Sequence, residues 1–264
     1  MNRLLLLLTI LFSYPVFSQT SPPASKLPAI KHEASFKHGE ELNYVLRYGF
    51  IHGGTATISS TQTKLGDTNV FHSSALAKTT GLVDKLFKVH DIYESYYTVD
   101  SNLPVKAVRN IREGSYKYYD EVTFDRRENV VISQKSGKHK VPEKILDMVS
   151  AFFYLRRIDF SNAKINDIIY FDTFFGDELF PFSVIYKGKE EIKTSAGKFK
   201  CLKFLPIVEP GRIFKENDDM LFWLSDDENK VPVLVKFDMI VGSFKCELTS
   251  FKNLKYEPTS LIEK

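Results

Sequence analysis

Apolar and polar residues alternate along most of the chain, and this two-residue period limits the folds that it can adopt. In the segment LNYVLRY every second residue is large and apolar: Leu42, Tyr44, Leu46 and Tyr48. This alternation is typical of a β-strand with one buried face, because successive side chains of a strand point to opposite sides. Similar segments span residues 55–63, 70–78, 87–99, 104–112, 116–125, 130–133, 168–174, 180–193, 198–207, 220–224, 231–237 and 242–251.

Short turns separate these segments, for example Gly66-Asp67 and Glu113-Gly114. Strands that follow one another at this spacing form antiparallel meanders. Aromatic and β-branched residues dominate them, as a half-buried pleated surface favours. The sequence therefore predicts a mainly β fold, with a strongly curved antiparallel sheet or an open barrel-like meander and one main helix packed on it.

One segment breaks the alternation and predicts the main helix, at about residues 142–158. In VPEKILDMVSAFFYLRRIDF, large apolar residues recur at intervals of three and four: Ile145, Met148, Phe152 and Leu155. This spacing places them on one face of a helix, and Pro142 stands where a first helical turn tolerates proline. An apolar face needs a partner, so we expect the helix to cover the curved face of the sheet. A shorter helical turn is predicted at 82–86.

The start of the chain predicts export. Arg3, the apolar run from Leu4 to Phe12 and a cleavage site between Ser18 and Gln19 form a secretory signal peptide, residues 1–18. A bilayer span needs about 20 apolar residues, so neither this run nor any later stretch predicts a transmembrane segment in the mature chain. The mature protein is expected to be periplasmic. Its predicted parts are a flexible linker rich in Pro, Ser and Ala, one β-rich domain and a C-terminal tail, at residues 19–35, 36–256 and 257–264.

The glycine pair of HGGT, residues 52–55, has two interpretations. In α/β-hydrolases a His-Gly-Gly loop stabilises an oxyanion, but it works with a serine in Gly-x-Ser-x-Gly, and this chain has no such pentapeptide. Gly53 and Gly54 stand between alternating segments, where glycine allows a bulge, a bend or a close approach of two backbones. The sequence favours this second interpretation.

Charge and motif content argue against several other functions. Basic and acidic residues nearly balance, with a net charge of +3, which gives no basis for nucleic-acid binding. The six histidines form no His-x-His or His-Glu-x-x-His motif and have no Cys-x-x-Cys partner, so no metal site is predicted. Because no nucleotide-binding loop or catalytic motif stands out, neither a cofactor nor an enzymatic activity is expected.

The two cysteines, Cys201 and Cys246, both lie in strand-like segments. An oxidising compartment permits a disulfide between them, whereas a buried free thiol packs as a small apolar group. The sequence leaves both alternatives open.

The predicted helix and the single tryptophan supply the candidate ligand-binding residues. Phe152, Phe153 and Trp223 would line the apolar part of a pocket, and Arg156 would meet an acidic head group. The alternative is structural: Asp147 and Arg156 pair with the sheet and fix the helix, and Trp223 packs in the core.

Four stretches carry a family resemblance: FKHGEELNYVLRYGFIHGGTATIS, KVHDIYESYYTVDSNLPVKAVRNIREGSYKYYDEVTFD, LDMVSAFFYLR and LFWLSDDENKVPVLVKFDMIVGSFKCEL. In their order and spacing they resemble the exported Gram-negative bacterial family known as domain of unknown function 3108. The resemblance implies an exported, β-rich single domain, and it supplies no activity or catalytic residues to transfer. A curved sheet covered by a helix is also similar to the periplasmic lipoprotein carriers, which hold acyl chains in a half-barrel.

The predicted function is therefore non-catalytic: a periplasmic binding or carrier protein for an apolar or amphiphilic envelope ligand such as a lipid. The alternative is a structural or assembly factor of the cell envelope, which would engage other envelope proteins through its sheet. A stably bound lipid favours the first function, and a co-purifying protein favours the second.

Overall fold

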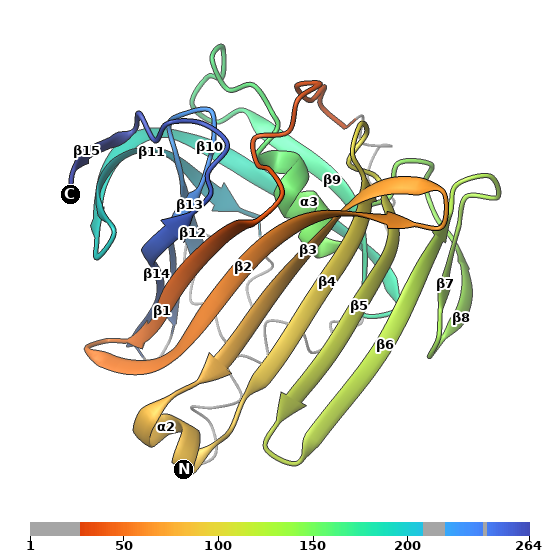
Figure 1. Ribbon diagram of the computed structural model, residues 1–264, viewed down its shortest axis with the longest axis horizontal. Coiled ribbons are helices and arrows are strands. Elements are labelled where there is room, and N and C mark those ends of the chain that lie inside the picture. Colours follow the sequence, from red (N-terminus) through yellow and green to blue (C-terminus); the bar gives the residue numbers. More distant parts are fainter. Residues whose placement is uncertain (1–26, 208–219, 240–241) are drawn as a thin grey trace.

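The computed structural model describes residues 27–207, 220–239 and 242–264, so the expected signal peptide lies outside the described residues. The described strands form one 15-stranded sheet, in which the neighbouring strands pair antiparallel (Figure 1). The strands are β1 Glu40–Tyr48, β2 Ile51–Leu65, β3 Thr68–Thr79, β4 His90–Thr98, β5 Pro104–Glu113, β6 Tyr116–Asp125, β7 Val130–Ser133, β8 Gly137–Lys140, β9 Ile168–Phe175, β10 Glu178–Thr194, β11 Gly197–Pro206, β12 Met220–Ser225, β13 Pro232–Met239, β14 Gly242–Lys252 and β15 Leu261–Glu263. The prediction of a mainly β fold on an unclosed antiparallel sheet is confirmed.

The strand order follows the chain in two meanders. Strands β1 to β8 lie in sequence order, β9 to β14 do the same, and β1 pairs with β14 to join the two halves. Strand β15, which lies within the expected C-terminal tail, pairs with β11. Strands β8 and β9 are therefore the edges of the sheet, and no ladder of hydrogen bonds connects them among the described residues. We call the junction between β6–β8 and the β9–β10 hairpin the seam.

The main helix, α3, spans Met148–Leu155 and is shorter than the predicted range 142–158. Asp147 starts it, because its side chain accepts hydrogen bonds from two backbone N–H groups of the first turn at 2.9 and 3.0 Å. Leu146 forms a β-bridge with Thr173 of β9, so its apolar side chain belongs to a strand-like contact and not to a helical turn. The predicted shorter helix is present as α2, Gly81–Leu86.

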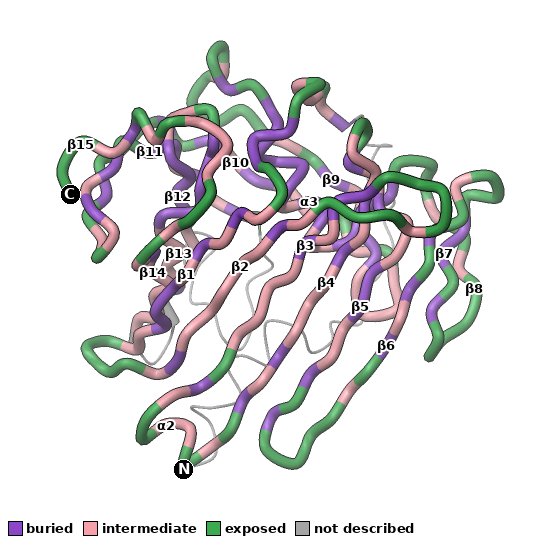
Figure 2. Tube along the Cα trace, viewed as in Figure 1, coloured by how far each residue is buried: buried purple, intermediate pink, exposed green. Residues whose placement is uncertain are grey.

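Helix α3 lies against the sheet and contacts β3, β4 and β9 (Figure 1). Its Phe153 enters a cluster of rings that are at most 2% exposed, together with Phe36, Phe71 and Tyr97. The Phe36 ring is central, since its centroid lies 4.8 Å from that of Phe71 and 4.7 Å from that of Phe153. Edge-to-face pairs at this distance stabilise the core beyond their buried area. Buried residues accordingly gather around α3 (Figure 2).

Residues 27–35 differ from the flexible linker that the sequence predicts for 19–35. Leu27 and Ser35 are buried, and Ile30 forms a β-bridge with Ile158 just after α3. The guanidinium of Arg157, itself buried, donates hydrogen bonds to two carbonyl groups of this segment at 2.6 to 3.2 Å. Because a buried cation needs such acceptors, this part of the range is packed over the end of α3.

The HGGT glycines lie inside β2, which continues through them. The register between β1 and β2 shifts opposite Gly53, which is the extra residue of a β-bulge. Gly54 lies so close to β3 that a Cβ atom there would be 3.2 Å from the Lys78 carbonyl carbon and closer still to its oxygen. Both roles that the sequence favours for glycine here, a bulge and a close backbone approach, are present.

Candidate functional site

The four residues predicted to bind a ligand do not meet in one pocket. Phe152 is half-buried and packs against two core clusters, and Phe153 belongs to the ring cluster under α3. Trp223 is 4% exposed and packs in a third cluster, where its indole N–H donates to Glu190 at 3.0 Å. Trp223 is therefore a core residue, which is the structural alternative.

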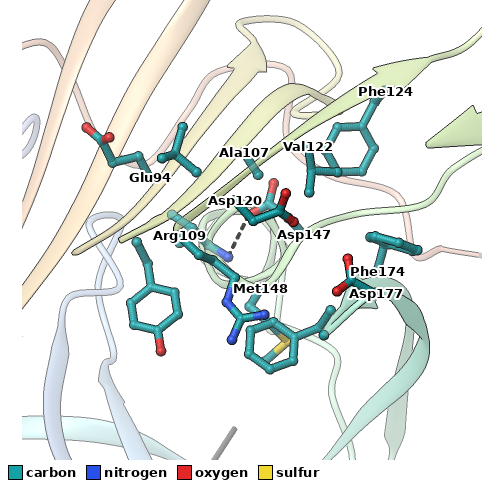
Figure 3. Close-up of a pocket in the computed structure, with 15 residues that line it drawn as sticks. Glu94, Ala107, Arg109, Asp120, Val122, Phe124, Asp147, Met148, Phe174 and Asp177 are labelled. Atoms are coloured by element: carbon teal, nitrogen blue, oxygen red, sulfur yellow. Dashed lines mark hydrogen bonds between the residues drawn. The ribbon is translucent and has the colours of Figure 1, made fainter. Parts of the chain in front are cut away.

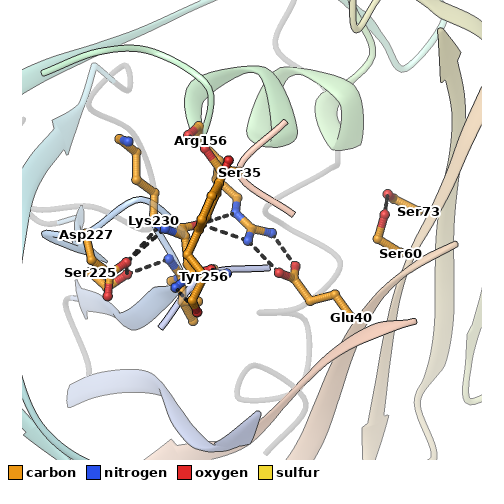
Figure 4. Close-up of polar contacts among 12 residues, drawn as sticks. Ser35, Glu40, Ser60, Ser73, Arg156, Ser225, Asp227, Lys230 and Tyr256 are labelled. Atoms are coloured by element: carbon orange, nitrogen blue, oxygen red, sulfur yellow. Dashed lines mark hydrogen bonds and ion pairs between the residues drawn. The ribbon is translucent and has the colours of Figure 1, made fainter. Parts of the chain in front are cut away.

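Arg156 forms a buried ion pair with Glu40 (Figure 4). Its Nη atoms donate to the Glu40 carboxylate at 2.7 and 3.0 Å, and Nε and Nη2 donate to the Asn229 carbonyl at 3.2 and 2.9 Å. Neither charged side chain is more than 1% exposed. The guanidinium carbon also lies 5.1 and 5.2 Å from the ring centres of Phe36 and Phe153. Arg156 therefore fastens the end of α3 to β1, so it is not the contact for an acidic head group that the sequence suggests.

The two cysteines are free thiols. Cys201 lies on β11 and Cys246 on β14, with β12 and β13 between them. Three spacings between neighbouring strands amount to about 14 Å, whereas a disulfide joins Cα atoms less than about 7 Å apart. Burial raises the pKa of each thiol to about 12, which keeps both protonated at neutral pH.

A pocket lies at the seam, where side chains connect the two edges of the sheet (Figure 3). Strands β4, β5 and β6, the start of α3 and the β9–β10 hairpin surround a cavity of about 30 Å³. A wider hollow of about 500 Å³ beside the β2–β3 hairpin has no buried charged side chain in its lining. The apolar side chains at the seam pocket are Ala107, Val108, Val122, Phe124, Met148, Val149, Phe174 and Phe175.

Arg109 is the one cation in the lining of the seam pocket. It extends from β5 toward the β9–β10 hairpin, and its guanidinium carbon lies 4.8 Å from the ring centre of Tyr118 and 4.3 Å from that of Phe175. Its Nε atom is buried and has no hydrogen-bond partner in the described part of the chain. A buried donor without an acceptor costs about 1–3 kcal/mol, so an acceptor that reaches this atom gains that free energy.

Asp120 and Asp177 also line the seam pocket, and Asp120 lies directly opposite Arg109 in the β5–β6 ladder. The Ser133 hydroxyl oxygen lies 3.0 Å from Asp120 Oδ2 and 2.9 Å from Asp177 Oδ1, and the Tyr118 hydroxyl donates to Asp177 at 3.4 Å. Burial raises the pKa of Asp120, and its hydrogen bond with Ser133 partly offsets this. These contacts tie β6 and β7 to the β9–β10 hairpin across the seam.

A second acidic pair lies where β4 begins and β5 ends. Asp91 and Glu113 are 2% and 3% exposed, and their carboxyl groups are hydrogen-bonded to each other. Burial, and then the charge of Asp91, raise the pKa of Glu113 to about 8. Burial also raises the pKa of Asp91, although the backbone N–H of Arg112, which donates at 2.9 Å, opposes the shift. The pair therefore shares one proton at neutral pH.

We expect this pair to make the protein less stable as the pH rises from 4.5 to about 8. Across this window the folded state holds a proton on Glu113 that the unfolded state has lost, so the free energy of unfolding falls with rising pH. Glu113→Gln should flatten this dependence. Glu121→Gln is the control, because a hydrogen bond from Lys106 lowers the pKa of Glu121 and keeps its titration outside the window. Urea midpoints measured over this pH range test both, and parallel profiles for wild type and Glu113→Gln would contradict the expectation.

Arg109, Asp120 and Asp177 were not predicted as site residues, although strand alternation carries a signal for Arg109 and Asp120. Asp120 shares its side of β6 with the buried Val122 and Phe124, and Arg109 shares its side of β5 with Ala107. A charged residue at a position that alternation assigns to the buried face needs a partner or a ligand.

The described residues are 27–207, 220–239 and 242–264. No group of three or more His, Cys, Asp or Glu side chains in these ranges is placed to hold a metal ion. No helix in the same ranges has the length and apolar character needed to cross a bilayer.

The fold and the seam pocket define a class of protein: an unclosed, barrel-like antiparallel sheet with one helix packed against it. Within this class the chain belongs to the family described as protein of unknown function DUF3108, whose model matches residues 43–249. Membership of this family, which the sequence resemblance predicted, is thereby confirmed. No curated protein matches the chain in sequence.

Solved structures resemble the fold at low sequence identity. A "beta-barrel-like protein" of the domain of unknown function DUF1849 from Brucella abortus matches with a TM-score of 0.56 and 9% identity, over 85% of this chain and 100% of its own. A "putative lipoprotein" from Parabacteroides distasonis and a "putative exported protein" from Bacteroides fragilis, both 10% identical, have TM-scores of 0.36 and 0.34. They cover 84% and 83% of this chain and 100% and 99% of their own. The first similarity concerns the fold alone.

Proposed function

We propose that the protein is an exported, non-catalytic binding protein that holds an amphiphilic envelope ligand, such as a lipid, at the seam. Arg109 carries the proposal, because its buried Nε atom lacks a partner beside a mainly apolar pocket. The polar part of an amphiphile would offer an acceptor to Arg109, and its apolar part would lie against Phe124, Met148 and Phe174. The predicted signal peptide supports export, and we place the protein in the periplasm of a Gram-negative bacterium.

A ligand of the size of a lipid fits only if the two sides of the seam move apart. The cavity of about 30 Å³ has room for one or two water molecules, which is far less than an acyl chain occupies. The contacts across the seam favour such an opening, because they are made by side chains, such as the Arg109–Phe175 stacking and the Ser133–Asp177 hydrogen bond. Each is worth about 1 kcal/mol, so the burial of a ligand's apolar surface can offset their loss.

Native mass spectrometry of the mature protein from an exporting host, followed by organic extraction, tests the proposal. We expect a stoichiometric adduct that is released as lipid. Arg109→Met retains an unbranched apolar side chain and removes the donor, so the adduct should fall about tenfold. Arg112→Met is the matched control, because Arg112 lies on the same strand with its side chain exposed, and it should retain the adduct.

Two results would count against the proposal. A wild-type mass without an adduct would show that no ligand is held. An equal adduct in Arg109→Met and wild type would show that Arg109 does not contribute to binding. Circular dichroism of each variant shows whether the protein is folded, so that loss of the adduct is not mistaken for loss of structure.

A second candidate function is an assembly factor, and strand β9 favours it. Its first half lies at a sheet edge with Ile168 and Tyr170 42% and 49% exposed, while Leu146 pairs further along, at Thr173. An exposed apolar edge can pair with a strand of another protein. A partner captured by wild type but not by Tyr170→Lys, together with a bare mass, would favour this function.

A further inference from the structure

The three most exposed large apolar side chains of the described residues lie at one end of the sheet. Phe50, in the turn between β1 and β2, is 93% exposed, and Leu82 and Leu86 of α2 are each 73% exposed. Ile51 and Tyr116, at the starts of β2 and β6, are 47% and 52% exposed. These elements share the end of the sheet that carries α2 (Figure 1). We call these five side chains the apolar rim.

Backbone hydrogen bonds hold the parts of the apolar rim beside one another. The N–H of Thr80, just before α2, donates to the carbonyl of Gly53 in β2 at 3.1 Å. The N–H of Gly114, in the β5–β6 turn, donates to the carbonyl of Lys88 after α2 at 2.8 Å. The apolar rim is therefore one preformed surface, so little conformational entropy is lost when it binds.

Cations flank the apolar rim. Of the acidic groups nearby, Asp91 and Glu113 are buried together, and the half-buried Asp84 accepts a hydrogen bond from the Thr79 hydroxyl at 2.9 Å. The exposed cations, none of which forms an ion pair within the described ranges, are Lys85, Lys88, Arg112 and Lys117. The surface thus combines projecting apolar side chains with unpaired positive charge.

We propose that the apolar rim docks the protein on the surface of an anionic lipid membrane. Phe50, Leu82 and Leu86 enter the boundary between head groups and acyl chains, and the flanking cations meet lipid phosphates. Apolar groups beside Lys and Arg are the combination that binds such an interface, through buried apolar area and through attraction to anionic lipids. This surface is built from residues outside the seam pocket, so the inference goes beyond the proposed ligand and does not rest on it.

Vesicle flotation tests the docking. The mature protein should float with vesicles of phosphatidylethanolamine and phosphatidylglycerol and stay behind with vesicles of phosphatidylcholine at the same ionic strength. Leu82→Ser with Leu86→Ser should weaken binding at least about tenfold, because two apolar side chains no longer leave water. Lys85→Glu with Lys88→Glu should weaken it by at least about tenfold as well, and added salt should weaken the wild type.

Ile165→Ser is the matched control for the leucine variants. Ile165 is 65% exposed in the loop after α3, at the opposite end of the sheet, so its loss should leave flotation unchanged. Because the substituted side chains are exposed, all variants should keep the wild-type spectrum and urea midpoint.

Either of two results would overturn the docking. The wild type would fail to float with anionic vesicles, or the double leucine variant would float with them as well as the wild type does. A third result would assign the surface to a second copy of the chain. In that case wild type would sediment as a dimer, the leucine variants would sediment as monomers, and none would bind vesicles.

Discussion

Glu40→Gln is expected to lower the free energy of unfolding by about 3–5 kcal/mol. Glu40 is the carboxylate that neutralises Arg156, whose guanidinium is buried between β1, the Asn229 carbonyl and the rings under α3. An amide at position 40 removes the negative charge and leaves the guanidinium buried without a counter-ion, which is the costly way to break such a pair. The urea midpoint should fall while the slope of the transition stays the same, since unfolding still exposes the same surface area.

The neighbouring residue supplies the matched control. Glu41 also forms an ion pair, with Lys252 at 3.2 Å, but its side chain is 38% exposed and that of Lys252 is 66% exposed. Because water screens such a pair, Glu41→Gln should leave the urea midpoint close to that of the wild type. Equal effects of the two substitutions would show that burial does not set the contribution of the Glu40 pair.

A paired replacement separates the loss of the ion pair from the loss of packing. Glu40→Leu with Arg156→Met removes both charges and leaves apolar side chains in the same space. Buried pairs replaced in this way often lose little stability, so the double variant should be more stable than Glu40→Gln alone. A double variant as unstable as Glu40→Gln would point to the lost hydrogen bonds with Asn229.

Much of the strand arrangement could be predicted, because one face of most strands is buried and alternation records that burial. The alternation of Leu42, Tyr44 and Leu46 gave β1, since these side chains are at most 6% exposed. Strand β8, Gly137–Lys140, carries no such signal, because the edge strand GKHK has no buried residue. The pairing of β1 with β14 could not be predicted either, since the alternation within one strand does not indicate which strand it pairs with.

The helix prediction failed at its ends for a related reason. Ile145 and Leu146 continue the apolar spacing of α3, but Ile145 packs in a core cluster near β6 and Leu146 bridges to β9. A loop that packs into the core is as rich in apolar residues as a buried helical turn, so the sequence does not distinguish the two. The N-cap, Asp147 followed by Ser150, was the local signal that fixes the true start.

The sequence predicted an apolar pocket with a cationic contact, but it did not predict where in the fold the candidate site lies or which residues form it. Alternation places Arg109 and Arg112 on opposite sides of β5, but only the structure shows that Arg109 lies at the seam and Arg112 in solvent. The seam itself depends on where β9 and β10 return to β6, after more than forty intervening residues. Sequence alternation gives the side of a strand on which a residue lies, whereas a pocket needs the relative positions of distant strands.

The glycine pair in β2 offers the second large effect. Gly54→Ala is expected to lower the free energy of unfolding by about 3 kcal/mol. The new Cβ would lie 3.3 Å from the Thr79 Cα atom and press against the Lys78 carbonyl group, and all of these are backbone atoms held in the β2–β3 ladder. They can retreat only if the Gly54–Thr79 register opens, because no flexible side chain is there to move aside.

Gly53→Ala is the control for Gly54→Ala, because it adds the same methyl group one residue earlier. Its Cβ would meet no atom closer than the Leu46 carbonyl oxygen at 3.7 Å, which is ordinary contact. We expect a change within about 1 kcal/mol, since the smaller entropy of the unfolded chain favours alanine. Urea unfolding of the two variants measures the difference directly. If Gly53→Ala proved the more damaging, the bulge and not the close approach to β3 would be what demands glycine in HGGT.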